Sequence, residues 1–411
     1  MISFHEAELS NGLKVIAEVN DEARSMALGV IIETGARDEQ PALAGISHFV
    51  EHALFKGSER MDASSVNMAF DDLGAKYNAF TAEEVTAYHG AVLPENQNEL
   101  LRLLAELMHP ALRASDLDTE RQVILEEIKM YSDQPESRLF DRLRPLYHGA
   151  HPAGNNILGT PETLAAIDSR VMHDYFARHY SARTALLVAT GNVNWPALIA
   201  VAEENLADLS TEGFERARPP FHAEARAPVV LTDPTVTRLH MGFMAPGWAV
   251  RDPRREEAAL LANILGDSEN SRLYWRLVDS GIADAADFGH EPMDGLGAFG
   301  GYASSDPSRA QEVLDGVREV LMEAQRDGVR SDELERAKRK AAVSTVLHAE
   351  TPYGRLLPLG MEYLVSGELL SLGEDVKRIK AVRLETVNTL LDARPFDRMT
   401  VAAIGPISTL T

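Results

Sequence analysis

The chain has 411 residues, of which 45% are hydrophobic and 25% charged, a composition typical of a folded protein with about two to four domains. Its net charge of −23 argues against nucleic acid or an anionic membrane as the main partner, because both bind to basic surfaces. No run approaches the ~20 apolar residues that cross a bilayer, and the N-terminus has no signal-peptide pattern, so we expect a cytoplasmic protein.

The first half of the chain predicts a buried strand followed by a helix. Residues 26–34, MALGVIIET, form a nearly continuous run of apolar and β-branched residues that ends at GARDE, as a buried strand and a turn would. The next stretch, GISHFVEHALFKGSERM at 45–61, has apolar residues at helical spacing. A further strand is predicted at 184–193, TALLVATGNV.

A similar order recurs in the second half. TRLHMGFMAPGW at 237–248 predicts a strand, and the residues after it turn through Asp-Pro into a helix that Gly266 ends. MTVAAIGPI at 399–407 predicts the last strand. The order of elements therefore indicates one plan used twice.

Residues 211–228 form the best linker candidate, because they combine two adjacent prolines with mixed charge. We therefore predict two similar α+β halves, residues 1–210 and 229–411, joined by this segment. Two unrelated domains are the alternative, since the repeat is faint in a single sequence.

The stretch SHFVEH places three chemically active side chains together. His48, Glu51 and His52 stand at i, i+3 and i+4, so a helix projects them from one face. Two imidazoles one turn apart can clamp Zn²⁺, and a glutamate between them can sit beside a metal-bound water without binding the metal. A chance cluster on a solvated helix is the alternative. The second half has ALLANIL at the corresponding place, without any ligand-type side chain.

The chain has no cysteine, so a third ligand must be a carboxylate or another imidazole. The predicted helix within 116–141 offers Glu127, which lies among apolar side chains, whereas Glu126 faces Gln122 and Lys129. A carboxylate on an apolar face is costly unless it is paired or binds a cation, which favours Glu127. Glu120, two turns earlier on nearly the same face, could orient a ligand histidine or could simply stabilise the start of the helix.

These residues resemble a known family. HFVEH followed by TERQVILEEIKMY is similar to the inverted-motif zinc peptidases of the pitrilysin or M16 family, which includes insulin-degrading enzyme and mitochondrial processing peptidase. The spacing from His52 to Glu127, 127 − 52 = 75 residues, also resembles theirs. So do NGLKVI, ETGARDE, FKGSERM, YNAFTAEEVTAYH and HPAGNNILGT, and the resemblance covers essentially the whole chain.

The resemblance implies the LuxS/MPP-like metallohydrolase fold, in which each of two similar α+β halves has an antiparallel sheet with packed helices. The length of the chain resembles the short, M16B-like branch of the family. In that branch two subunits pair as a chamber around peptides, so a related subunit or a second identical chain is the implied partner.

The resemblance also assigns roles to individual residues. It implies that His48, His52 and Glu127 bind zinc and that Glu51 is the general base. Glu120 would support a ligand histidine.

The resemblance further places Asn78 and Ala79 on the strand that receives the substrate as an added β-strand. Asn78 could also hydrogen-bond near the scissile carbonyl. An ordinary asparagine at a strand edge or turn is the alternative for this residue.

One stretch departs from the family pattern. Active members carry an Arg and a Tyr in the second half, in a pattern like R-x-x-x-G-L-x-Y, and here Val278 and Asp284 are read at those positions. Neither can donate a hydrogen bond to a developing oxyanion. We therefore expect the zinc-bearing subunit of a heteromeric zinc endopeptidase that acts on peptides or unfolded segments. The alternative is a non-catalytic assembly or peptide-binding subunit, which should have lost one or more of the motif residues that this chain retains.

Overall fold

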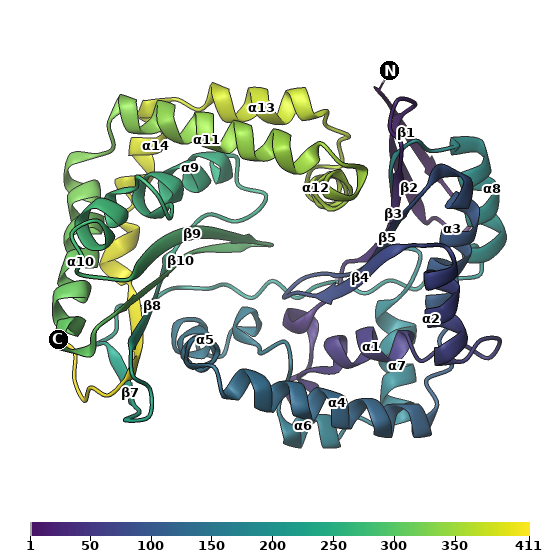
Figure 1. Cartoon of the computed structure of the whole chain (residues 1–411), viewed down its shortest axis with the longest axis horizontal. Coiled ribbons are helices and arrows are strands. Elements are labelled where there is room, and N and C mark those ends of the chain that lie inside the picture. The colour runs from purple at the N-terminus through teal and green to yellow at the C-terminus, as the bar shows by residue number, and fades with distance from the viewer. Residues whose placement is uncertain (1) are drawn as a thin grey trace. The chain divides into compact units, whose positions relative to one another are not determined.

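A computed structural model describes residues 2–411, and their contacts divide them into two compact units (Figure 1). Unit 1 comprises the residues up to Ile128 together with Asn155–Ala217 and Leu347–Leu370. Unit 2 comprises Lys129–Gly154, Arg218–Val346 and Ser371–Thr411. Each unit contains one sheet with helices packed on it, so the predicted α+β class with two similar halves is confirmed.

Within residues 2–411, the sheet of unit 1 has the strand order β1-β2-β6-β3-β5-β4. Its strands are β1 (Ile2–Glu8), β2 (Lys14–Asn20), β3 (Met26–Ile32), β4 (Lys76–Thr81), β5 (Thr86–Val92) and β6 (Ala185–Gly191). β2 and β6 run parallel and the other neighbours antiparallel, so the sheet is mixed rather than purely antiparallel as expected. β4 forms one edge, and no strand in the described part of the chain pairs with its outer side.

The sheet of unit 2 repeats this arrangement in the order β7-β11-β8-β10-β9. Its strands are β7 (Val229–Thr232), β8 (Leu239–Pro246), β9 (Ala285–Met293), β10 (Leu296–Ser305) and β11 (Thr400–Gly405). β7 and β11 are parallel and the remaining neighbours antiparallel. From β2 to β4 and from β7 to β9 the two sheets therefore share both order and direction, and only β1 has no counterpart.

Helices in both units contribute apolar residues to the cores that surround the sheets. In unit 1 they are α1 (Ile46–Leu54), α2 (Ala63–Asp72), α3 (Gln97–Leu107), α6 (Pro161–Ala165), α7 (Ser169–His179), α8 (Trp195–Leu206), α12 (Pro352–Ser366) and most of α4 (Ala114–Ser132). In unit 2 they are α5 (Pro135–His148), α9 (Arg255–Gly266), α10 (Ala310–Asp327), α13 (Leu372–Ala381), α14 (Leu384–Leu391) and most of α11 (Ser331–Ala349). No helix among the described residues is both long enough and apolar enough to cross a membrane.

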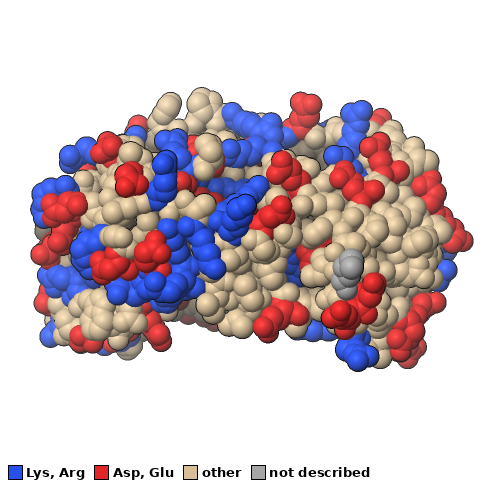
Figure 2. Space-filling view, turned by 90° about the horizontal axis from the view of Figure 1, so that it is seen from above, with Lys and Arg blue, Asp and Glu red and all other residues tan. Residues whose placement is uncertain are grey.

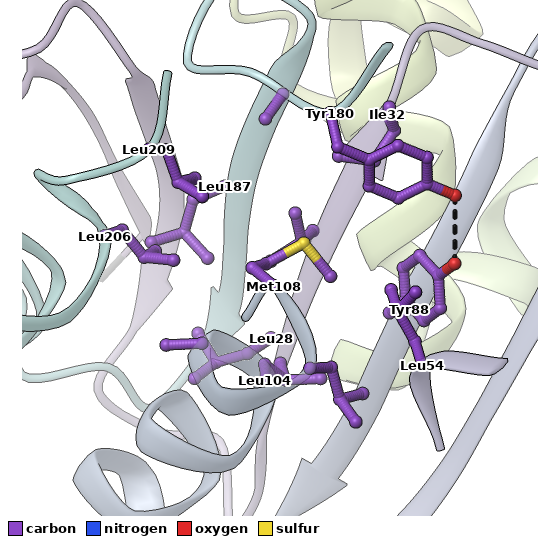
Figure 3. Packing of buried hydrophobic residues seen from close by; sticks show 14 of the residues in the cluster. Leu28, Ile32, Leu54, Tyr88, Leu104, Met108, Tyr180, Leu187, Leu206 and Leu209 are labelled. Atoms are coloured by element: carbon purple, nitrogen blue, oxygen red, sulfur yellow. Dashed lines mark hydrogen bonds between the residues drawn. The ribbon is translucent and has the colours of Figure 1, made fainter. Parts of the chain in front are cut away.

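The sheet of unit 1 is covered on both faces, which explains why every residue of β3 is buried. Val30 and Ile32 lie in the cluster that contains Phe49 of α1, whereas Ile31 lies in the cluster that contains Leu356 of α12. Figure 3 shows part of the first cluster, including the 3.0 Å hydrogen bond between the hydroxyl groups of Tyr88 and Tyr180. Each fully buried Leu, Ile or Phe contributes about 1.5–3 kcal/mol of transfer free energy.

Two helices, α5 and α12, lie in a different unit from the helix that precedes each of them in the chain. α5 follows α4 but packs on β8 and β11, where its Leu143 approaches Gly242 so closely that a Cβ there would lie 2.8 Å from the leucine. α12 follows α11 but packs on β3 and β6. The compact units therefore do not coincide with the continuous ranges 1–210 and 229–411, although the chain also changes unit at Ala217, inside segment 211–228.

Candidate metal centre

A buried glutamate fixes the start of α1, the helix with both histidines. Glu39 accepts backbone N–H groups from Gly45 at 2.7 Å and from Ser47 at 2.8 Å, which satisfies amides that a helix N-terminus leaves free. Burial raises the pKa of Glu39 to about 8, although these hydrogen bonds oppose the shift. The direction in which α1 leaves the loop is thus set by a carboxyl group in the protein interior.

Two glycines hold the other side of the same turn. Gly45 has φ +92°, a left-handed conformation, and a Cβ there would lie 2.6 Å from the carbonyl oxygen of Leu158. A Cβ on Gly159 would lie only 2.2 Å from the carbonyl oxygen of Ala44. The LGT segment at 158–160, which belongs to the predicted HPAGNNILGT signature, therefore packs its backbone directly against the entry to α1.

His48, His52 and Glu127 converge on one point. Nε2 of His48 and Nε2 of His52 each lie 3.7 Å from Oε2 of Glu127, and the potential ligand atoms of the three residues are all within 4.8 Å of one another. Tetrahedral bonds of about 2.1 Å require ligand atoms about 3.4 Å apart, so a small contraction would allow all three to bind one Zn²⁺. Two imidazoles and one carboxylate leave the fourth position open, as in catalytic zinc sites.

Glu120 contacts the ring nitrogen of His52 that points away from the cluster. Its Oε1 lies 3.0 Å from Nδ1 of His52, and its other oxygen contacts the Lys56 ammonium. Burial favours protonation of Glu120, but the hydrogen bonds from His52 and Lys56 outweigh it and lower the pKa of the carboxyl group. An ionised Glu120 keeps the proton of His52 on Nδ1 and leaves the Nε2 lone pair directed at the cluster.

The two histidines differ in electrostatic environment. Burial, followed by the neighbouring His52, lowers the pKa of His48 to about 3, so its imidazole is neutral at physiological pH. Burial would also lower the pKa of His52, but its hydrogen bond to Glu120 and the surrounding carboxylates raise it on balance. A cation in the cluster would therefore replace a proton on His52 rather than on His48.

Glu51 lies on α1 between the histidines and is outside the converging set. Its Oε2 accepts a hydrogen bond from Oγ1 of Thr81 at 2.7 Å. Burial is the main cause that raises its pKa, and Glu127 adds to the effect. The carboxyl group is therefore both oriented and made more basic than an exposed glutamate.

The sequence pattern did not identify two of the residues that support this site. Thr81 occurs in YNAFT and Lys56 in FKGSERM, both stretches that carry the family resemblance. Their partners Glu51 and Glu120 were identified, but the contacts themselves depend on which strand and which helix end lie beside α1 and α4.

Ala79 and Asn78 lie on β4 but face opposite sides of the sheet. Tyr77 stacks on Phe70 of α2 and Thr81 bonds to Glu51, so Ala79 between them faces the metal cluster. Asn78 pairs with His89 on the other face of the sheet. The structure thus does not bring the Asn78 side chain together with the cluster, although the backbone of both residues forms the free edge of β4.

Comparison with known proteins places the chain in a family. Models of the insulinase family of peptidases, M16, and of the M16 inactive domain match residues 14–161 and 166–341. A Bacillus subtilis protein named uncharacterized zinc protease YmxG is 32% identical over 400 residues, which cover 96% of this chain and 97% of that protein. The chain belongs to peptidase family M16.

Solved structures agree on the fold. A protease from Helicobacter pylori has a TM-score of 0.89 at 19% identity and covers 98% of this chain and 100% of its own. A Pseudomonas fluorescens protein described as a peptidase M16 inactive domain has a TM-score of 0.90 at 18% identity and covers 100% of this chain and 99% of its own.

In the stretch LVDSGIADAADF of the second half, the position that corresponds to the family Arg differs by one residue from the predicted Val278. When R-x-x-x-G-L-x-Y is aligned on Gly281, the Arg position falls on Leu277. Leu277 is fully buried, and Asp284, at the Tyr position, contacts Arg238. The conclusion is unchanged, because neither side chain can donate a hydrogen bond to a substrate.

Proposed function

We propose that this member of the M16 family is a zinc-dependent endopeptidase that cleaves peptides or unfolded segments. The observation that carries the proposal is the convergence of His48, His52 and Glu127 beside the half-buried carboxyl group of Glu51. The relatives named zinc proteases support the same reaction class.

The residues of the chain divide the work of peptide hydrolysis. When bound, zinc supplies a Lewis acid that polarises the scissile carbonyl and acidifies a water. Glu51 accepts the proton of the attacking water, for which its raised pKa suits it, and then passes that proton to the leaving amine. Thr81 holds Oε2 of Glu51 in place, and Glu120 holds the ring of His52.

The free edge of β4 is the proposed docking site for the substrate backbone. A peptide that adds to this edge as a strand would be held through main-chain hydrogen bonds, which accept many sequences. The small side chain of Ala79 lies on the face of the cluster, while Asn78 contributes its backbone to the edge. This binding mode suits an endopeptidase that acts on unfolded segments.

A partner subunit completes the proposal. The Arg and Tyr of the family pattern are replaced here by Leu277 and Asp284, so donors to the oxyanion would come from a related M16 subunit. A second copy of this chain could pair with it but would carry the same Leu277 and Asp284. The alternative function is a peptide-binding subunit without catalysis. The retained set of three ligands and Glu51 favours the enzyme.

Cleavage of a quenched fluorescent peptide by the zinc-loaded chain tests the proposal, with Glu51→Gln as the control. Glu51→Gln is expected to keep stoichiometric zinc, measured by metal analysis, and to lose activity, because it removes the proton acceptor and no ligand. Zinc binding without cleavage would indicate that the chain needs a related subunit for activity. Mixing the chain with related subunits and measuring cleavage again would then test this. A chain that binds no zinc would contradict the peptidase function itself.

A further inference from the structure

We infer that the face of β4 opposite the metal cluster forms a subsite for an acidic side chain of the bound peptide, with Lys76 as the residue that selects it. This inference rests on the proposed function, because it takes the peptide to lie along the edge of β4. It names the class of substrate: extended segments with Asp or Glu at a defined distance from the scissile bond.

Lys76 is an exposed cation that lacks a carboxylate partner. Most of the arginines and lysines that the structure describes form ion pairs, but no Asp or Glu among residues 2–411 lies within ion-pair distance of Lys76. Its ammonium instead lies 4.5 Å from the ring centroid of Tyr353, at the start of α12 in the same unit. A cation over an aromatic face is held in place while its outer side remains available to an anion.

Aromatic side chains build the rest of this face. His89 lies 5.2 Å from the ring of Tyr353 and 6.1 Å from the ring of Phe80, and it is opposite Asn78 in the β4–β5 pair. His89 is buried, whereas Asn78 is exposed. One face of the free edge is thus lined by Lys76, Asn78 and Phe80, and beside them pack the rings of His89 and Tyr353.

Strand geometry places the selected residue. The side chains of an added strand alternate between the two faces, so every second one lies on the Lys76 face, about 5 Å from its neighbour on β4. Lys76 is 81 − 76 = 5 residues from Thr81, which marks the position of Glu51. At about 3.4 Å per residue this is about 17 Å, so the acidic side chain is expected about five residues from the scissile bond, on one side of it only.

The expected preference runs against the overall charge of the protein. A net charge of −23 favours cationic peptides at long range, but Lys76 repels a cationic side chain at this one position. An exposed ion pair contributes about 0.2–1 kcal/mol, which corresponds to a preference of about 1.4- to 5-fold for Glu over Gln.

Peptide binding measured by fluorescence anisotropy tests the subsite without cleavage. The protein is the zinc-loaded Glu51→Gln chain, and the probes are neutral peptides in which one Glu is moved along the sequence from position to position. We expect binding to be about 3-fold tighter when Glu stands at one particular peptide position. Peptides with Glu at the adjacent positions should show no gain. Lys76→Gln should remove the gain, and Lys76→Glu should create a preference for Lys at the same position.

Lys14→Glu is the matched control. Lys14 also lies over a tyrosine of α12, 5.4 Å from the ring of Tyr363, but on β2 rather than on the free edge. Its reversal should leave the position of the Glu preference unchanged. Absence of a positional Glu preference, or one that survives Lys76→Glu, would overturn the subsite. If the wild-type chain does not cleave peptides, that result contradicts the proposed function and not the subsite, because the binding comparison does not depend on cleavage.

Discussion

The two units place a helix at the same point of the same topology, but only one of these helices carries candidate metal ligands. α1 follows β3 and contacts the edge strand β4, and α9 follows β8 and contacts the edge strand β9. In unit 1, α1 directs His48 and His52 at Glu127 of α4. The carboxylate of Glu127 there lies beside two imidazole nitrogens, at 3.7 Å from each.

Unit 2 supplies cations of its own at the corresponding helices. Lys340 of α11 lies 2.7 Å from Asp267 at the end of α9, and Arg272 forms two hydrogen bonds of 2.9 and 2.8 Å with Glu333 of α11. These residues line a cavity of about 110 Å³. Figure 2 shows Lys and Arg side chains gathered among acidic ones over the left part of the view, where the elements of unit 2 lie. The comparison teaches that the same topology can place carboxylates beside imidazoles in one unit and beside basic side chains in the other.

The largest expected effect is the loss of a ligand from unit 1. Glu127→Gln should weaken zinc binding by more than the ~10–100-fold that is typical of changes behind the ligands, because it removes the only anionic ligand of the three. Competition with a chromophoric chelator measures the affinity.

Glu126→Gln is the matched control for this change. Glu126 is the exposed neighbour of Glu127 on α4, and its replacement should leave zinc binding unchanged. Equal loss in both variants would show that general negative charge, and not a defined ligand set, attracts the metal.

The converse change removes an internal cation from unit 2. Arg272→Met should lower the free energy of unfolding by about 3 kcal/mol, because Glu333, whose side chain is 7% exposed, loses its main partner. Zinc affinity should not change. Urea denaturation followed by circular dichroism measures the difference.

Arg276→Met separates this effect from the general loss of an arginine. Arg276 pairs with Glu319, whose side chain is 60% exposed, so its removal should cost less than about 1 kcal/mol. If both variants lost the same stability, the proposed contrast between buried and exposed pairs would be wrong.

The backbone contact behind α1 gives a smaller effect that reaches the metal. Gly159→Ala forces a Cβ to within 2.2 Å of a backbone oxygen of Ala44, and we expect a loss of about 2–3 kcal/mol with weaker zinc binding. Gly74→Ala has the same left-handed strain, at φ +60°, but meets no atom within 4 Å, so it should cost about 1 kcal/mol and leave zinc binding intact. Thermal unfolding with and without zinc distinguishes the two.

The convergence of the three predicted ligands could be anticipated from the sequence because the face on which each one lies is determined locally. His48 and His52 share a face through helical spacing alone, and Glu127 is identified by its apolar neighbours on its own helix. The α+β class and the repeated order of strands follow from hydrophobic patterns of the same short range. Each of these features is encoded within about one element of the chain.

Features that depend on long-range packing were not accessible in this way. Because side chains alternate along a strand, the sequence predicts that Asn78 and Ala79 face opposite sides of the sheet. Only the packing of α1 and α12 determines which of these sides holds the cluster. The contact of Lys56 with Glu120 joins residues 120 − 56 = 64 positions apart. The exchange of α5 and α12 between units likewise follows from which sheet offers an apolar face, a property of the assembled fold.

The most gradual expected effect is the pH dependence that Glu39 gives to unit 1, because it is spread over several pH units. The pKa of Glu39 is about 8 in the folded chain against an ordinary 4.5, so the folded state holds the proton more tightly than the unfolded state. The stabilisation linked to this proton is complete below pH 4.5 and is lost as the pH rises to about 8, with a slope of at most about 1.4 kcal/mol per pH unit. In Glu39→Gln, which has no such proton, the slope should be absent. Urea unfolding of both proteins between pH 5 and pH 8 should therefore show the wild type losing stability relative to the variant, and a constant difference would mean that the N–H groups of Gly45 and Ser47 hold the carboxylate ionised throughout.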